Sequence, residues 1–151
     1  MVIFCMEISV SEFITLCIVG NLEEVNSRTR LQKFAFLIQE EAIDAEPYDF
    51  KKYDYGAFSD ILMEDLEKLE DRGLVDITSS RTFGGNTRNT YEITSKGETV
   101  LKAHYPDSNI EEVKNDIENF VGRHSDKSTR ELIEYEKENH PQFITNTVYQ
   151  T

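Results

Sequence analysis

The sequence predicts an α+β fold in which helices dominate and the strands form one hairpin. Apolar residues recur at helical spacing in six separate segments, and only two short segments alternate as strands do. No helix lies between two predicted strands, as a parallel sheet would require. The composition fits one folded domain over residues 1–151, because 38% of the residues are hydrophobic and 30% are charged.

Three helices are predicted in the first half of the chain. Each begins at a serine whose side chain can cap the free N–H groups of the first turn, and each ends before a residue that disfavours helix. Each also carries apolar residues three and four positions apart, so that one face is apolar. The expected helices run from Ser9 to about residues 20–21, from Ser27 to before Pro47, and from Ser59 to Gly73.

An aromatic segment separates the second and third helices. We expect it to form a short extended piece and then a turn, because Gly56 interrupts it. Its rings could stack on bases or bind a partner protein, but core packing under the turn, with one or two tyrosines exposed, is the simpler interpretation. The aromatic residues are Tyr48, Phe50, Tyr53, Tyr55 and Phe58.

A hairpin and three more helices follow. Residues 74–78 and 90–94 alternate between apolar and polar, and Gly84-Gly85-Asn86 lies between them as a turn signal. Each later helix is opened by a capping box, in which a serine precedes a glutamate by three positions, as in the first helix of the chain. The boxes are Ser9/Glu12, Ser95/Glu98, Ser108/Glu111 and Ser128/Glu131.

This order of elements, with three helices before a hairpin, is the outline of a winged helix-turn-helix. We expect its core over about residues 9–105 and a C-terminal helical extension over about residues 107–143. Residues 110–121 and 129–139 of the extension carry apolar stripes. We expect these stripes to be buried partly against a second copy in a homodimer, although the first helix could cover them within one chain.

Several segments resemble the YwgA-like winged-helix proteins. They are S-R-T-R-L-Q-K-F-A-F-L at 27–37, Y-D-F-K-K-Y-D-Y-G-A-F-S-D-I-L at 48–62 and E-D-L-E-K-L-E-D-R-G-L-V at 64–75, and residues 132–143 look like a helix that this group carries after the wing. The Panacea antitoxin domain is more distantly similar. Y-E-I-T-S-K-G at 91–97 is also similar to the wing exit of MarR- and PadR-type regulators.

The resemblance implies a winged-helix fold and a DNA-binding transcriptional regulator, because family members are mostly described as regulators. It carries the fold more firmly than the function. One residue departs from the family pattern, since Ala57 stands where the family turn usually has proline. The backbone of this turn is therefore less constrained here.

The distribution of charge bears on nucleic-acid binding. The net charge of −13, from 29 acidic and 16 basic residues, repels nucleic acid unless basic groups gather locally. Only residues 73–106 have a basic excess, with three acidic and four basic residues. The third helix would expose Asp60, Met63, Glu64, Glu67, Lys68 and Asp71, so its deep insertion into a major groove is disfavoured.

Ten residues are nevertheless predicted to contact double-stranded DNA. They open the second helix, precede the aromatic turn, cap or lie on the third helix, or flank the hairpin tip. They are Arg28, Arg30, Lys33, Lys51, Lys52, Ser59, Lys68, Arg81, Asn86 and Arg88. The alternative is a non-enzymatic protein-interaction module, antitoxin-like or an adaptor, which the acidic third helix favours.

No catalytic, metal or cofactor site is predicted. The three histidines share no metal-binding spacing, and Gly84-Gly85 lacks the Lys-Ser/Thr of a phosphate loop. Cys5 and Cys17 lie among apolar residues and predict reduced, buried thiols. We expect a cytoplasmic protein without membrane association, because no stretch approaches the roughly 18 apolar residues of a membrane span and no signal peptide is recognisable.

Overall fold

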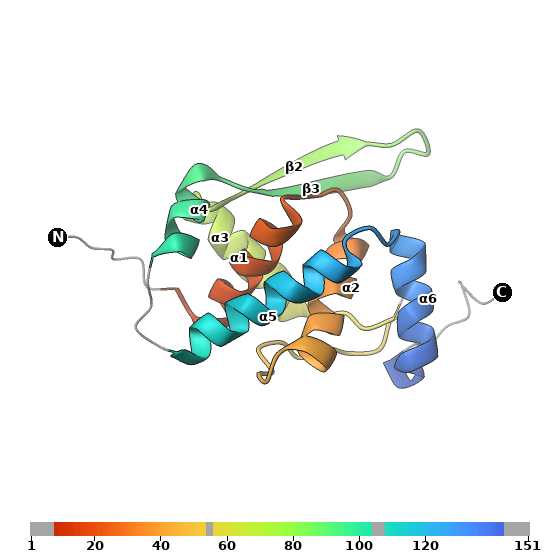
Figure 1. The fold of residues 1–151 in the computed structure, drawn as a ribbon. Helices are drawn as coiled ribbons and strands as arrows, with labels where there is room; N and C mark the ends of the chain where they lie inside the picture. The colour runs from red at the N-terminus through yellow and green to blue at the C-terminus, as the bar shows by residue number, and fades with distance from the viewer. Residues whose placement is uncertain (1–7, 54–55, 104–107, 144–151) are drawn as a thin grey trace.

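A computed structural model describes residues 8–53, 56–103 and 108–143 (Figure 1). Within these residues it contains six α-helices and a three-stranded antiparallel sheet, so the α+β class is confirmed. The helices are α1 (Val10–Leu22), α2 (Arg28–Leu37), α3 (Asp60–Asp71), α4 (Ser95–Lys102), α5 (Ser108–His124) and α6 (Thr129–Asn139). The strands are β1 (Glu24–Val25), β2 (Val75–Arg81) and β3 (Thr87–Ile93). A π-helical turn, Ile38–Ala42, continues α2, and a 3-10 turn, Pro141–Phe143, follows α6.

The sheet has the strand order β1-β3-β2 and is built on the predicted hairpin. Strands β2 and β3 pair from Val75 opposite Ile93 to Arg81 opposite Thr87, so both extend further toward the tip than the apolar alternation indicated. Strand β1 pairs with β3, with Val25 opposite Tyr91, and was not predicted because two residues show no alternation. The hairpin runs along one side of the helices (Figure 1).

Side-chain caps fix the starts of most helices. The capping boxes at Ser9/Glu12 and Ser128/Glu131 are confirmed, and Ser59 caps α3 as predicted. The box predicted at Ser95 is wrong, because the hydroxyl of Thr94 caps α4 by accepting from the N–H of Gly97 at 3.0 Å. The N–H of Thr94 also donates to the Leu74 carbonyl at 3.0 Å, so the helix starts directly after this contact. The Ser108 side chain of the remaining box lies outside the described part of the chain.

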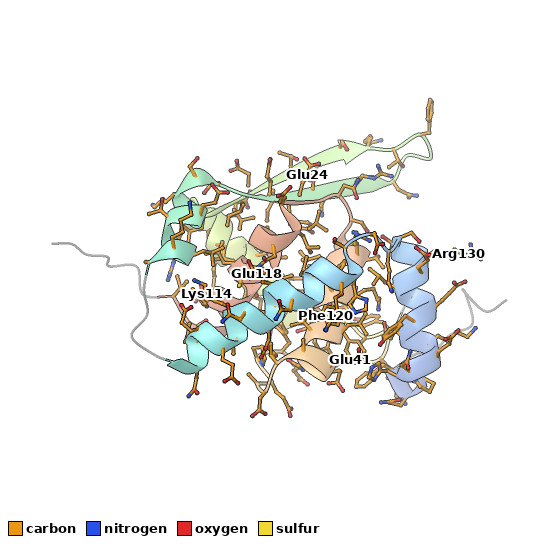
Figure 2. All side chains as sticks on the ribbon, viewed as in Figure 1. Glu24, Glu41, Lys114, Glu118, Phe120 and Arg130 are labelled. Carbon is orange, nitrogen blue, oxygen red and sulfur yellow. The ribbon has the colours of Figure 1, made fainter. Side chains whose placement is uncertain are left out.

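Helix α1 lies at the centre of the core, where it packs against α3, α4, α5 and the sheet. Its residues 12–19 are buried, and the apolar ones among them from Ile14 to Val19 belong to one contiguous cluster that includes residues of α2, α3, α5 and α6. Phe120 of α5 is labelled in Figure 2. Its ring packs edge-on against that of Phe34 of α2, with ring centroids 6.5 Å apart. Helices α5 and α6 therefore complete the core rather than project from it.

This packing removes the sequence-based argument for a homodimer. The apolar stripes of α5 and α6 are buried within the single chain, where α5 packs on α1 and α6 packs on α2. The stripe residues Ile117, Phe120, Val121, Leu132 and Ile133 are at most 4% exposed. The alternative that one chain covers its own stripes is the correct one, and no second copy is needed for them.

Two further expectations concern Cys17 and the membrane. Burial of the Cys17 side chain raises the pKa of its thiol to about 12, which keeps it protonated and unreactive at neutral pH, as expected of a core cysteine. Cys5 lies outside the described residues, as do residues 104–107 at the predicted boundary between core and extension. Among the described helices, none is long and apolar enough to cross a membrane.

Candidate nucleic-acid interface

Helix α2 and its π-helical continuation position the long connection that leads to α3. The Gln32 amide forms two hydrogen bonds with the backbone of Ser59, donating to its carbonyl at 3.0 Å and accepting from its N–H at 2.9 Å. Gln39 binds the backbone of Tyr48 in the same way, at 3.1 and 2.9 Å. These two amides satisfy buried backbone groups of the connection at Tyr48 and at Ser59, where no helix or strand supplies the partners.

A buried ion pair closes the same connection against α6. The Lys33 ammonium lies 2.7 Å from Oε1 of Glu136 and also donates to the Ala57 carbonyl at 3.2 Å. Oε2 of Glu136 accepts from the N–H of Ala57 at 2.8 Å. Burial lowers the pKa of Lys33, and the adjacent Glu136 carboxylate offsets this effect. Lys33 is therefore an internal cation, and we remove it from the residues that could contact DNA.

Arg30 and Ser59 are also engaged inside the protein. The Arg30 guanidinium donates to the carbonyls of Lys127 at 2.5 Å and Ser125 at 2.8 Å, and it lies 5.0 Å from the centroid of the Phe34 ring. Burial lowers the pKa of Arg30. Ser59 is fully buried as the N-cap of α3. Burial of Ser59 rules out its predicted contact with DNA. The half-buried Arg30 side chain holds the segment before α6, and its contact with DNA stays a prediction.

Seven of the predicted residues remain exposed. Their side chains make no hydrogen bond or ion pair with any residue that the structure describes. They are Arg28, Lys51, Lys52, Lys68, Arg81, Asn86 and Arg88. The structure brings two of them, Arg28 and Arg88, to one cleft.

This cleft, which we call the hairpin cleft, lies between the hairpin and the first turns of α2 and α6. Its volume is about 670 Å³. Two arginines and otherwise only uncharged polar residues form its wall, and none of the lining residues is Asp or Glu. The lining residues are Asn26, Ser27, Arg28, Thr29, Thr82, Thr87, Arg88, Asn89 and Thr129.

The backbone adds to the positive character of the hairpin cleft. Ser27 and Ser128 each cap one N–H group, those of Arg30 and Glu131, and the other N–H groups of a first helical turn have no partner within the helix. The positive ends of two helix dipoles therefore lie at this cleft. Arg130, labelled in Figure 2 near the start of α6, is not one of the lining residues and pairs with Glu134 at 3.5 Å.

The other exposed candidates lie elsewhere. Lys68 is on α3, where the remaining exposed side chains are all acidic: Asp60, Glu64, Glu67, Glu70 and Asp71. Lys51 is paired through its backbone with Phe58, by hydrogen bonds of 2.9 Å in both directions, and Lys52 follows it. Arg81 lies opposite Thr87 at the end of the hairpin ladder, and Asn86 precedes Thr87 in the tip.

Sequence reasoning missed the uncharged lining of the hairpin cleft. Asn26 to Thr29 and Thr87 to Thr90 are two short runs without an acidic residue in an otherwise acidic chain, and this signal could have been used. Thr129 carried no signal, because its place beside the hairpin depends on the packing of α6 against α2.

A second cluster of polar side chains is buried in the core. The Tyr48 hydroxyl lies 2.7 Å from Oγ1 of Thr15, which donates to Asp65 at 3.2 Å, and all three residues are buried. Burial raises the pKa of both Tyr48 and Asp65. No group of three or more potential metal ligands occurs among the residues that the structure describes.

No protein-family model matches the chain, and no curated protein matches its sequence. The site must therefore be argued from its own geometry.

Proposed function

We propose that this protein is a DNA-binding transcriptional regulator of winged-helix type that holds the phosphate backbone in the hairpin cleft. The observation that carries the proposal is the composition of the cleft, since Arg28 and Arg88 share a wall that contains no acidic residue in a chain of net charge −13. Two arginines that form no ion pair with a described residue, together with two helix N-termini, attract phosphate groups.

The arrangement of elements supports the same proposal. Helices α1, α2 and α3 precede the hairpin in the order of a winged helix-turn-helix, and β1 adds a third strand on the β3 side. One feature differs from the common motif. The connection between the second and third helices spans residues 43–59, whereas a helix-turn-helix usually has a turn of about 3–4 residues.

The mode of binding follows from the charges of α3. Its exposed face is acidic apart from Lys68, and carboxylates read bases poorly and repel phosphates. We therefore place the DNA backbone along the hairpin and the first turn of α2, with α3 outside the major groove. Asn26, Asn89 and the threonines of the cleft can hydrogen-bond phosphate oxygens, and such contacts position the protein without selecting a sequence.

The salt dependence of binding tests this proposal. For a labelled duplex of about 20 base pairs, replacing Arg28 and Arg88 by alanine should weaken binding to all sequences and reduce the slope of log affinity against log salt by about 2, near 0.9 per lost phosphate contact. Lys68→Ala is the matched control, because Lys68 is an exposed cation outside the cleft, and it should leave affinity and slope unchanged. Equal slopes for wild type and the double arginine variant would remove the proposal.

A second candidate function is a protein-interaction module. It is favoured by the aromatic side chain of Phe83, which is fully exposed at the hairpin tip, and by the strongly acidic surface. Absence of duplex binding at low salt would favour this function over the first.

A further inference from the structure

A second cleft adjoins the hairpin cleft at the first turn of α2. We call it the aromatic cleft; its volume is about 360 Å³. It is lined by Arg28, Thr29, Gln32, Lys33, Tyr53, Gly56, Ala57 and Phe58. Arg28 and Thr29 line both clefts, so the two clefts are neighbours at the first turn of α2.

The wall of the aromatic cleft combines rings with Arg28, whose side chain forms no hydrogen bond or ion pair with a described residue. Tyr53 is 52% exposed and packs against Phe58, with ring centroids 5.0 Å apart and an interplanar angle of 64°. The Gln32 and Lys33 side chains beneath are already satisfied by Ser59, Ala57 and Glu136. The groups left for a ligand are therefore the aromatic surface and the Arg28 guanidinium.

These two groups suit the two parts of a nucleotide. A flat base can stack on an aromatic side chain whatever its sequence identity, and a phosphate is attracted by arginine. Among the described residues that line the aromatic cleft, none is acidic, and Arg28 supplies a cation for an anionic group. The volume lies within the range of about 300–1,000 Å³ of small-ligand sites, which is enough for one nucleoside unit.

We propose that the aromatic cleft binds one nucleotide, with its base stacked on Tyr53 and its phosphate beside Arg28. This nucleotide can be an unpaired residue of a DNA strand. In that case the inference rests on the proposed function and extends it, because the preferred ligand is duplex DNA with an unpaired nucleotide next to the duplex. A free mononucleotide has the same chemistry and is the other source.

The test compares two duplexes of identical sequence, one blunt and one with a single-stranded thymidine overhang. Wild type should bind the overhang duplex about fivefold or more tightly than the blunt one, because each base stacked on an aromatic side chain contributes measurably to affinity. Tyr53→Ala should abolish this preference and leave blunt-duplex affinity unchanged, while Tyr53→Phe should retain it. Phe83→Ala is the matched control, since it removes another exposed aromatic ring and should keep the preference.

Two arms separate the possible sources and failures. In the first arm, deoxyadenosine monophosphate is added to both complexes. If it abolishes the preference for the overhang duplex but does not displace the blunt duplex, the cleft also accepts a free nucleotide. The nucleotide could instead shift the NMR signals of Tyr53 in a wild-type protein that binds no duplex. This result would support the inference and contradict the proposed function. A preference that survives Tyr53→Ala, or no preference together with no nucleotide-induced shift, would overturn the inference.

Discussion

At the scale of single residues, the ion pair between Lys33 and Glu136 joins three segments at one buried point. Both side chains are at most 2% exposed, and each also forms a hydrogen bond with the backbone of Ala57. Taking two charges out of water costs several kcal/mol per ion, which only a close and well-bonded partner offsets. Each charge is therefore tolerated because the other is present.

Removing one member of this pair should be more harmful than removing both. Lys33→Met leaves the Glu136 carboxylate buried and unpaired, so we expect a loss of about 3–5 kcal/mol in the free energy of unfolding. The double variant Lys33→Met/Glu136→Gln keeps an acceptor for the Ala57 N–H without a buried charge, and should lose less than Lys33→Met alone.

Urea unfolding of four proteins checks the prediction: wild type, Lys33→Met, Glu136→Gln and the double variant. The control is Glu134→Gln, which breaks the exposed pair with Arg130 at 3.5 Å and should change stability by less than about 0.5 kcal/mol. A double variant that loses the sum of the two single losses would show that the charges do not depend on each other.

The buried Asp65 carboxyl predicts a pH dependence of stability. Burial raises its pKa above the ordinary value of 3.8. In the pH window between 3.8 and this raised pKa, the folded protein therefore holds a proton that the unfolded chain has lost. The contribution of Asp65 to stability is therefore full at low pH and falls as pH rises from 3.8 through the raised pKa.

Asp65→Asn should remove this dependence. Asparagine can still accept the hydrogen bond from Thr15 but never ionises. Relative to wild type, the variant should gain stability as pH rises through the window, measured by urea unfolding at several pH values. A difference between the two proteins that is constant with pH would contradict the assignment.

Residues differ in how far the sequence predicts their roles. Ser9, Ser59 and Ser128 were predicted correctly because a cap bonds to a group three residues away, which is visible in the local sequence. Lys33 was placed on the surface, because its partner Glu136 is 103 positions away and nothing local indicates the pairing. For the same reason the amide contacts of Gln32 and Gln39 were not predicted.

At the scale of elements, the connection between α2 and α3 is held from both sides. Gln32 and Gln39 bind its backbone from the α2 side, and Glu136 binds it from α6. At Gly56 the backbone φ is +102°, and a Cβ atom there would lie 2.6 Å from both carboxylate oxygens of Glu136 and from Nζ of Lys33. The close approach of α6 therefore requires glycine.

Gly56→Ala should destabilise the protein through both effects. We expect a loss of at least about 3 kcal/mol, since backbone strain alone costs about 1–2 kcal/mol and the ion pair must also shift. Gly85→Ala is the matched control, because its φ is +82° but nothing lies within 4 Å of the added atom, and it should lose only the strain. Thermal or urea unfolding distinguishes the two, and equal losses would contradict the close contact.

Elements were predicted to the extent that they depend on local signals. Capped, periodic helices and a glycine turn indicated α1 to α6 and the hairpin, although the start of α4 was misplaced by one residue. Strand β1 and the extra length of β2 and β3 come from pairing between backbones, which leaves little trace in short polar segments. The burial of α5 and α6 against α1 and α2 is likewise a tertiary outcome.

At the scale of the whole molecule, the distribution of charge is more informative than its sum. The net charge of −13 opposes binding to nucleic acid, yet none of the described residues that line the hairpin cleft or the aromatic cleft is acidic. The two arginines of the hairpin cleft could be predicted from the sequence, since Arg28 and Arg88 were among the candidates. Their meeting in one cleft could not, because it requires the hairpin, α2 and α6 to pack together.

The most direct measurement maps duplex DNA onto the protein by its effect on backbone amide NMR signals, which suits a chain of 17.5 kDa. Titration with a short duplex at low salt should shift the signals of residues 26–29, 82–89 and 129, and leave the exposed face of α3 unchanged. Shifts confined to residues 60–71, or no shift at all, would contradict the claim that the hairpin cleft holds the DNA backbone.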